Sequence, residues 1–257
     1  MKRTGFIAAV LVAAVSVTTA ARAQTQSSLR VLSSNGVKSV VEDLKTHIER
    51  SIGQSLSIEF STAASLAREI ETGQPFDVTI LTPALIEHLI ESGLVVAESD
   101  VEFARAGVGV GARPNTGRRD VTTLAALRET LLDAESVAFT TGGQSRATID
   151  AAFERLGIGA QMQAKTLLLG PGEAPGAVAA GKAELVLTLV SEILPEPRLE
   201  LVGPLPDELQ SYVSFAAGRS PAARDMRAAD ALLRYLAGAE LAAALARHGM
   251  EPVADGP

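Results

Sequence analysis

Small hydroxyl residues stand directly before an amphipathic stretch within residues 60–82. Ser61, Thr62 and Ser65 fall where a helix beginning near Ala63 leaves its first backbone N–H groups without intrahelical partners. Those donors and the positive end of the helix dipole favour a negatively charged guest. The same residue types also form an ordinary helix N-cap. This segment alone therefore leaves both an anion site and a structural cap open.

A second group of possible anion donors lies between a predicted strand and a predicted helix. It consists of Gly142, Gly143, Gln144, Ser145 and Arg146. The backbone N–H groups of such a turn can wrap an anion, and the guanidinium of Arg146 matches a carboxylate through two hydrogen bonds. The alternative is a glycine turn in which Ser145 caps the helix and Arg146 lies in solvent.

The same turn also resembles the nucleophile elbow of a serine hydrolase. Ser145 stands at the centre of the motif, and Asp207 and His248 follow in the order found in α/β-hydrolases. However, Ala147 replaces the last glycine of the motif, and no His-Gly oxyanion segment follows an early strand. A secreted serine hydrolase is therefore kept as a distant alternative. The three histidines lack metal-ligand spacing, so neither a metal nor a cofactor is predicted.

The elements that must position these residues alternate between short apolar runs and amphipathic stretches. The first block predicts strands at 29–32, 56–60 and 76–81, with helices at 37–52, 63–71 and 83–92. Asp77 opens the third strand, where a structural role as a cap or turn acceptor is expected. Because parallel strands place their ligand crevice at their carboxyl ends, we expect that crevice to be lined by Ser33, Ser34, Asn35, Ser61, Thr62 and Thr82.

A longer strand at 103–112, with three glycines, is predicted to cross into a second α/β block. There the pattern predicts helices at 124–132, 145–156 and 175–181 and strands at 137–140, 166–169 and 185–189. A second crossing strand at 212–217 precedes helices near 222–236 and 240–248. We therefore predict an α/β fold of two lobes, each a mostly parallel sheet flanked by helices, joined by two hinge strands. Lobe 1 would hold residues 24–105 and 214–257, and lobe 2 residues 106–213.

The first residues show the three-part pattern of a secretory signal peptide. Lys2 and Arg3 precede an apolar run at 6–17, and small residues close the segment at 21–23. The apolar run is shorter than the roughly 20 residues that a membrane span needs. We expect residues 1–23 to be removed after Ala23 and the mature protein to be periplasmic. The chain has no cysteine, so its stability must come from the core rather than from disulfides.

The charge balance limits the class of partner. Removal of residues 1–23 takes away three of 23 basic residues and none of the 30 acidic ones, leaving 20 against 30, or a net charge of −10. A negative surface without a basic tract argues against nucleic acid. If an anion binds, local donors must hold it against the global field.

The motifs, taken in order, resemble the periplasmic solute-binding proteins of ABC importers, and within them the molybdate-binding branch. The resemblance is carried by RVLSSNGVKSVVEDL, FSTAASLAREIETGQPFDVTILT, AFTTGGQSRATIDAAFERLGI, AGKAELVLT, GPLPDELQ, FAAGRSPAARDMRAADALLRYLAG and LARHGMEP. It implies a monomeric binding protein that closes two lobes around one small anion and delivers it to a membrane permease. It also implies that the protein is not an enzyme.

The resemblance also implies which residues contact a molybdate-like or tungstate-like oxyanion. The family's two ligand serines align with Gly36 and with Thr62 or Ala63, and its capping tyrosine aligns with Leu189. The complete set of candidate ligand residues is Ser33, Ser34, Asn35, Gly36, Ser61, Thr62, Ala63, Thr140, Gly142, Gly143, Gln144, Ser145, Arg146, Thr188 and Leu189. The alternative ligand is a small organic carboxylate held by Arg146.

Overall fold

The first third of the chain forms three successive βα units. The computed structural model describes residues 28–117 and 119–253, so the predicted signal peptide and its cleavage site lie outside the described residues. The units are β1 (Leu29–Ser34), a 3-10 turn η1 (Asn35–Val37) and α1 (Lys38–Ile52), then β2 (Leu56–Ser61) and α2 (Ala63–Glu71), then β3 (Val78–Leu81) and α3 (Pro83–Glu91). β1 pairs in parallel with both β2 and β3. This register places Ser34 opposite Ser61, as expected for a shared edge.

The start of α2 shows why these sequences form the predicted elements. The Thr62 hydroxyl accepts a hydrogen bond from the Ser65 backbone N–H at 3.2 Å and so caps the helix. The buried face then repeats at helical spacing through Ala63, Leu66 and Ile70. The helix begins and ends at the predicted residues.

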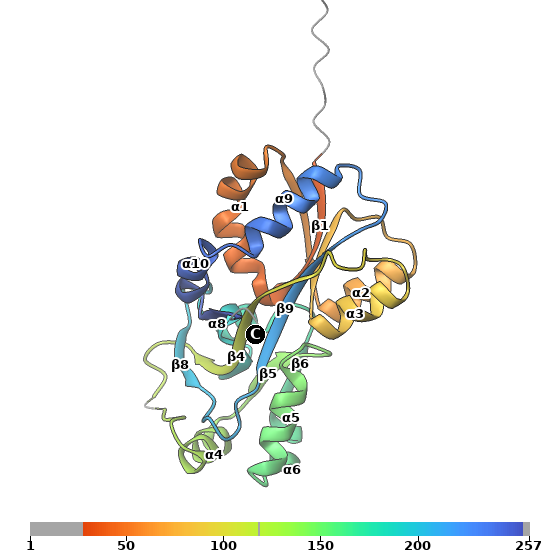
Figure 1. Cartoon of the computed structure of the whole chain (residues 1–257). Coiled ribbons are helices and arrows are strands. Elements are labelled where there is room, and N and C mark those ends of the chain that lie inside the picture. Colours follow the sequence, from red (N-terminus) through yellow and green to blue (C-terminus); the bar gives the residue numbers. More distant parts are fainter. Residues whose placement is uncertain (1–27, 118, 254–257) are drawn as a thin grey trace, which may run out of the picture.

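Two long strands connect the halves of one continuous sheet (Figure 1). Along β4 (Val101–Ala112), the first part pairs with β9 (Tyr212–Arg219) and β10 (Met250–Pro252), and the second part pairs with β7 (Leu185–Leu189) and β8 (Glu200–Pro204). The resulting order begins β2-β1-β3-β9-β4-β7 and ends with β5 (Val137–Thr140) and β6 (Thr166–Leu169). The predicted fold class, with two crossing strands, is confirmed.

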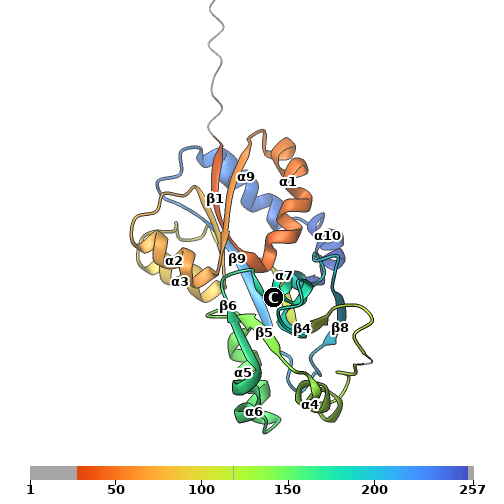
Figure 2. The same ribbon diagram turned by 180° about the vertical axis from the view of Figure 1, so that it is seen from behind.

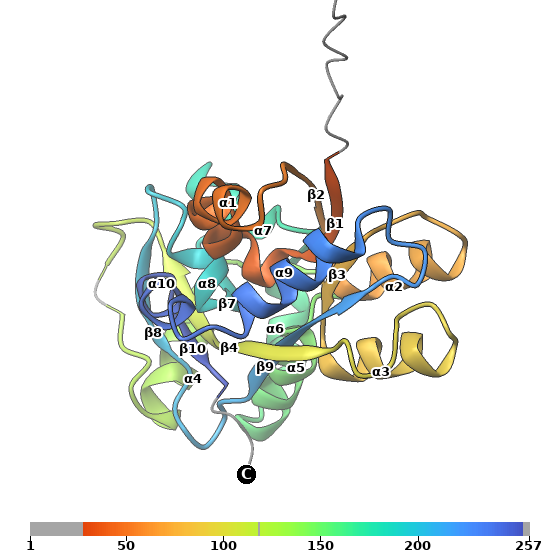
Figure 3. The ribbon, with the colours of Figure 1, turned by 45° about the horizontal axis from the view of Figure 1, so that its top comes forward.

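The second half repeats the α/β pattern (Figure 2). It contains α4 (Leu124–Asp133), β5 (Val137–Thr140), α5 (Arg146–Arg155), α6 (Gly159–Lys165), β6 (Thr166–Leu169), α7 (Ala174–Ala179) and α8 (Val190–Ile193). β5 pairs in parallel with β6 and β7. The chain then returns through β9 to α9 (Met226–Leu236) and α10 (Leu241–Arg247), and α9 lies beside α1 (Figure 3). Below, lobe 1 means β1–β3 with α1–α3, and lobe 2 means β5–β7 with α4–α8.

Four short elements were not predicted from the sequence. α6, β8, α8 and β10 have seven, five, four and three residues, too few to show a reliable hydrophobic period. The helix predicted from residue 222 begins only at Met226, because Asp225 accepts the Ala228 N–H at 2.9 Å and acts as its cap. Within the described part of the chain, no helix is both long and apolar enough to span a membrane.

Candidate functional site

A small cavity lies where the carboxyl ends of the strands from both lobes meet. Its volume is about 20 Å³, enough for one water molecule. Five of its lining residues carry a hydroxyl group, and no lysine or arginine is among the described lining residues. The lining residues are Ser34, Asn35, Thr62, Thr140, Gly143, Gln144, Ser145, Gly172, Thr188, Leu189 and Glu192. We call this space the deep cavity; a ligand there would be held by neutral donors.

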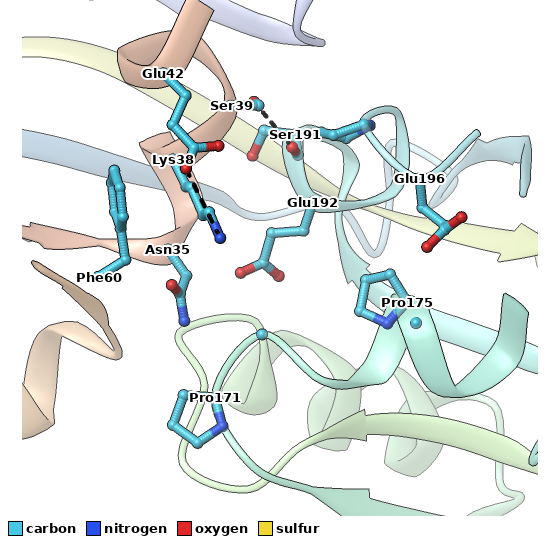
Figure 4. A pocket seen from close by; sticks show the side chains of 13 residues that line it. Asn35, Lys38, Ser39, Glu42, Phe60, Pro171, Pro175, Ser191, Glu192 and Glu196 are labelled. Atoms are coloured by element: carbon cyan, nitrogen blue, oxygen red, sulfur yellow. Dashed lines mark hydrogen bonds and ion pairs between the residues drawn. The ribbon is translucent and has the colours of Figure 1, made fainter. Parts of the chain in front are cut away.

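A larger space of about 450 Å³ adjoins the deep cavity (Figure 4). We call it the outer chamber; it shares Asn35, Gly172 and Glu192 with the deep cavity. Its other lining residues are Lys38, Ser39, Glu42, Phe60, Pro171, Pro175, Gly176, Ser191, Pro195 and Glu196. Below, the cleft means these two neighbouring spaces taken together.

Lys38 is the one cationic side chain in the described lining of the outer chamber. Its ammonium lies 3.9 Å from the Glu42 carboxylate and 5.6 Å from the centre of the Phe60 ring. Figure 4 shows the ends of the Lys38 and Glu192 side chains extending into the chamber, whereas the Asn35 amide points away from Lys38. A ligand that reaches from the deep cavity toward the surface would therefore pass this cation.

Hydrogen bonds join the two lobes around the deep cavity. The Ser34 hydroxyl donates to Gln144 Oε1 at 3.2 Å, and the Ser191 hydroxyl donates to the Gly36 carbonyl at 2.7 Å. The Ser39 hydroxyl donates to the Ser191 carbonyl at 3.2 Å. The first bond joins two residues that line the deep cavity, and the other two involve residues that line the outer chamber. Opening of the lobes, as in hinged binding proteins, would break all three.

Gly36 is surrounded too tightly to accept a side chain. An added Cβ would lie 2.3 Å from Phe215 Cζ and 2.9 Å from Leu189 Cδ1. Phe215 comes from the crossing strand β9 and is fully buried. The space that a ligand serine would need at this position is thus already filled by apolar atoms. The resemblance to molybdate-binding proteins implies a ligand contact at Gly36, and only the backbone of Gly36 could make it. Its N–H group donates to Ser34 Oγ at 3.3 Å.

Glu192 is a cleft residue that the sequence analysis did not identify. It lies on α8 and lines both spaces. Burial raises the pKa of its carboxyl group, against the opposing effect of hydrogen bonds from the Thr188 hydroxyl and the Leu189 backbone N–H. The available signal was an acid four residues after a strand-end hydroxyl, and nothing in that spacing distinguishes a cleft residue from an ordinary surface acid.

Gln144 offers a spare hydrogen-bond donor beside the deep cavity. Its Oε1 accepts from Ser34, whereas its buried Nε2 has no partner within the described residues. A buried N–H group without a partner is unfavourable by about 1–3 kcal/mol. A ligand oxygen that accepted this bond would remove that penalty.

Several predicted site residues lie away from both spaces. Arg146 pairs with Asp150 at 2.7 Å, lies 5.0 Å from the centre of the Phe139 ring, and lines a separate groove of about 620 Å³. The side-chain geometry therefore does not bring Arg146 to the cleft. Five other candidates also line neither space within the described residues: Ser33, Gly36, Ser61, Ala63 and Gly142.

The serine hydrolase alternative is wrong on geometry. Ser145 does line the deep cavity, but His248 lies against Asp43 at 3.2 Å. His47 and His88 likewise face Glu240 and Glu71, at 4.0 and 2.9 Å. In the described ranges no histidine is placed to activate Ser145, and no group of three or more metal-binding side chains is found.

Asp77 has the structural role that the sequence analysis expected. It is 1% exposed and accepts hydrogen bonds from the backbone N–H groups of Arg30 and Arg224, at 2.7 and 2.9 Å. The Arg224 guanidinium adds an ion pair at 2.7 Å. Asp77 therefore joins the start of β3 to β1 and to the loop before α9.

Residues 29–251 match a family described as bacterial extracellular solute-binding protein. The chain belongs to this family. A relative from Pseudomonas sp named aconitate isomerase is 27% identical over 237 residues, which is 90% of each chain. Among solved structures, a periplasmic molybdate-binding protein from Azotobacter vinelandii has a TM-score of 0.74 at 15% identity, covering 89% of this chain and all of that one.

A sulfate-binding protein from Mycobacterium tuberculosis also shares the fold. Its TM-score is 0.68 at 16% identity, and the match covers 89% of this solute-binding protein and 88% of the other chain. Identities this low show a common architecture and carry no information on the ligand. The periplasmic binding-protein fold that the motifs predicted is thus shown, together with the family.

Proposed function

We propose that this solute-binding protein captures a small organic acid in the cleft and delivers it to an ABC permease. The observation that carries the proposal is the deep cavity beside the outer chamber, with which it shares Asn35, Gly172 and Glu192. One carboxylate of the ligand would accept hydrogen bonds from hydroxyls of both lobes and from Gln144 Nε2. The rest of the ligand would occupy the outer chamber, with a second carboxylate near Lys38.

Two features favour a carboxylic acid over a tetrahedral oxyanion. Apolar packing prevents a ligand serine at Gly36. The position of the capping tyrosine holds the buried, apolar Leu189. The name of the Pseudomonas relative supports the same class of ligand.

A thermal-shift panel tests this proposal. A ligand that binds only the folded state stabilises it by about 2.7 kcal/mol at 100 times its Kd. For a domain of this size that corresponds to a rise in Tm of roughly 5–10 °C. The panel contains succinate, citrate, cis-aconitate and trans-aconitate against molybdate, tungstate and sulfate. The proposal requires at least one carboxylic acid to give a saturable shift; silence from all of them overturns it.

The second candidate ligand is a molybdate-like, tungstate-like or sulfate-like oxyanion. One observation favours it: the deep cavity is lined by five hydroxyls and no cation. Such a site holds an oxyanion by hydrogen bonds alone. A saturable shift with molybdate or tungstate, and none with the carboxylic acids, would select this candidate.

Location, partner and boundaries complete the proposal. Membership of an extracellular solute-binding family fits export, and we propose cleavage after Ala23, a monomer, and the lobe limits 24–105 with 214–257 and 106–213. Mass spectrometry of the exported protein gives its first residue. Light scattering gives its mass in solution, and a mass of two chains would contradict the monomer.

A further inference from the structure

Glu192 is an acidic group in the wall of the deep cavity, whose other described lining residues are all neutral. Its carboxyl group accepts from the Thr188 hydroxyl and the Leu189 backbone N–H, and in the described ranges it forms no ion pair. It lines both the deep cavity and the outer chamber. A ligand that spans the two spaces must therefore pass directly beside this carboxyl group.

Resting on the proposed function, we propose that Glu192 moves a proton within a bound unsaturated carboxylic acid, so that the protein isomerises the ligand's carbon–carbon double bond. The substrate class is an acid with a CH₂ group between a carboxylate and a C=C bond. Such a C–H bond is acidic because its electron pair can delocalise over the double bond and the carboxylate. The inference adds a reaction to a protein whose motifs predicted binding alone.

The reaction needs no reagent beyond substrate and Glu192. The Glu192 carboxylate takes a proton from the CH₂ carbon: the C–H bond breaks, an O–H bond forms, and the electron pair moves into a delocalised enolate. The new O–H group then returns its proton to the carbon at the far end of the allylic unit, and the double bond settles in its new position. The substrate gains and loses one proton, so atoms, charge and oxidation state balance.

The cleft supplies what this step needs. Thr140 and Ser145 line the deep cavity with hydroxyl groups, Gln144 lines it with an Nε2 that is unpaired among the described residues, and these donors would stabilise enolate oxygens bound there. Lys38 provides a positive charge in the neighbouring chamber. Burial also raises the pKa of Glu192, which strengthens it as a base.

Solvent isotope exchange tests the proposal. The purified protein is incubated with cis-aconitate or trans-aconitate in D₂O, and proton NMR follows both the isomer ratio and loss of the CH₂ signal. Because the Glu192 O–H proton exchanges with solvent, the wild-type protein is expected to interconvert the isomers and incorporate deuterium. Loss of a general acid–base group lowers such rates by about 10²–10⁴-fold. We expect that loss for Glu192→Gln, while its Tm still rises on adding ligand.

Glu87→Gln is the matched control, because Glu87 is exposed on α3 and lines neither space. It should exchange at the wild-type rate. Should Glu192→Gln fail to fold, Thr188→Val provides the second variant. Removing the Thr188 hydroxyl removes a bond that lowers the Glu192 pKa, so the pH profile of exchange should move to higher pH.

The outcomes separate this inference from the proposed function. If aconitate raises the Tm but neither isomerises nor exchanges, the activity is wrong and the binding proposal stands. If Glu192→Gln exchanges like wild type, or Thr188→Val leaves the pH profile unmoved, the assignment to Glu192 is wrong. If no carboxylic acid raises the Tm of the wild-type protein, the proposed function itself fails, and this inference fails with it.

Discussion

The packing around Gly36 predicts that even a methyl group is destabilising there. In Gly36→Ala the new Cβ would lie 2.3 Å from Phe215 Cζ, 2.8 Å from Phe215 Cε1 and 2.9 Å from Leu189 Cδ1. Contacts under 3.0 Å force atoms to move, and both Phe215 and Leu189 are buried. Overpacking of this kind is unfavourable by about 1–3 kcal/mol. At roughly 2–4 °C per kcal/mol, the Tm should fall by about 2–12 °C.

A double-mutant cycle assigns the effect to the right neighbour. Phe215→Leu removes the ring atoms that approach Gly36, so Gly36→Ala should be tolerated better in that background. We expect the two changes to couple by at least about 0.5 kcal/mol in favour of the double variant. Gly159→Ala is the control, because an added Cβ there meets no atom within 4 Å.

Urea unfolding followed by circular dichroism measures all four variants. The midpoint and slope together give the free energy of unfolding. Such comparisons carry an error of about 0.3 kcal/mol. If the free energies of unfolding of Gly36→Ala and the Gly159→Ala control differ by less than that, the Phe215 ring moves aside freely. The argument that apolar packing excludes a ligand serine would then be wrong.

Three further predictions concern charged groups. Asp77→Asn should destabilise the protein by about 2–3 kcal/mol, less than for a fully buried pair because the Arg224 side chain is 40% exposed. Burial opposes the ionisation of Asp77, but hydrogen bonding to Arg224 outweighs it and lowers the pKa of Asp77. The stabilisation is therefore present above pH 3.8 and lost on acidification, which urea midpoints from pH 3 to pH 7 would show. Because burial raises the pKa of Glu192, ionisation of this carboxyl group opposes folding increasingly above pH 4.5. Glu192→Gln should therefore have a higher Tm than the wild-type protein at pH 7 but not at pH 4. An equal difference in Tm at both pH values would contradict this. Lys38→Met should weaken binding of a dicarboxylic or tricarboxylic acid by up to about 5-fold, because a half-exposed ion pair contributes at most about 1 kcal/mol. Arg146→Ala should leave calorimetric Kd values unchanged; the reverse pattern would restore Arg146 as the carboxylate ligand.

The site residues that were predicted from the sequence lie at the ends of strands and helices, where neighbouring residues already indicate the local structure. Ser34 and Thr140 end parallel strands, and Thr62 caps a helix, so their convergence follows from the parallel βα pattern. The first crossing strand was predicted because its glycine-rich alternation differs from the short buried strands around it. In these cases the chemistry that forms the local structure also positions the side chain.

Side-chain direction and distant packing were not predictable in the same way. Arg146 turns to Asp150 one helical turn away, and this i,i+4 pair was visible in the sequence as a competing partner. Glu192 lies on a helix of four residues, too short for periodicity to show which side faces the cleft. The restriction on Gly36 comes from Phe215, near the other end of the chain, and only the folded sheet brings them together.

Isothermal titration of trans-aconitate and of molybdate into the same preparation, at pH 7 and matched ionic strength, tests the nature of the ligand most directly. A cleft that joins buried hydroxyls to a chamber with Lys38 predicts saturable binding of the tricarboxylic acid, weakened by Lys38→Met, and little or no heat from molybdate. Tight binding of molybdate, with no heat from trans-aconitate, would contradict the account.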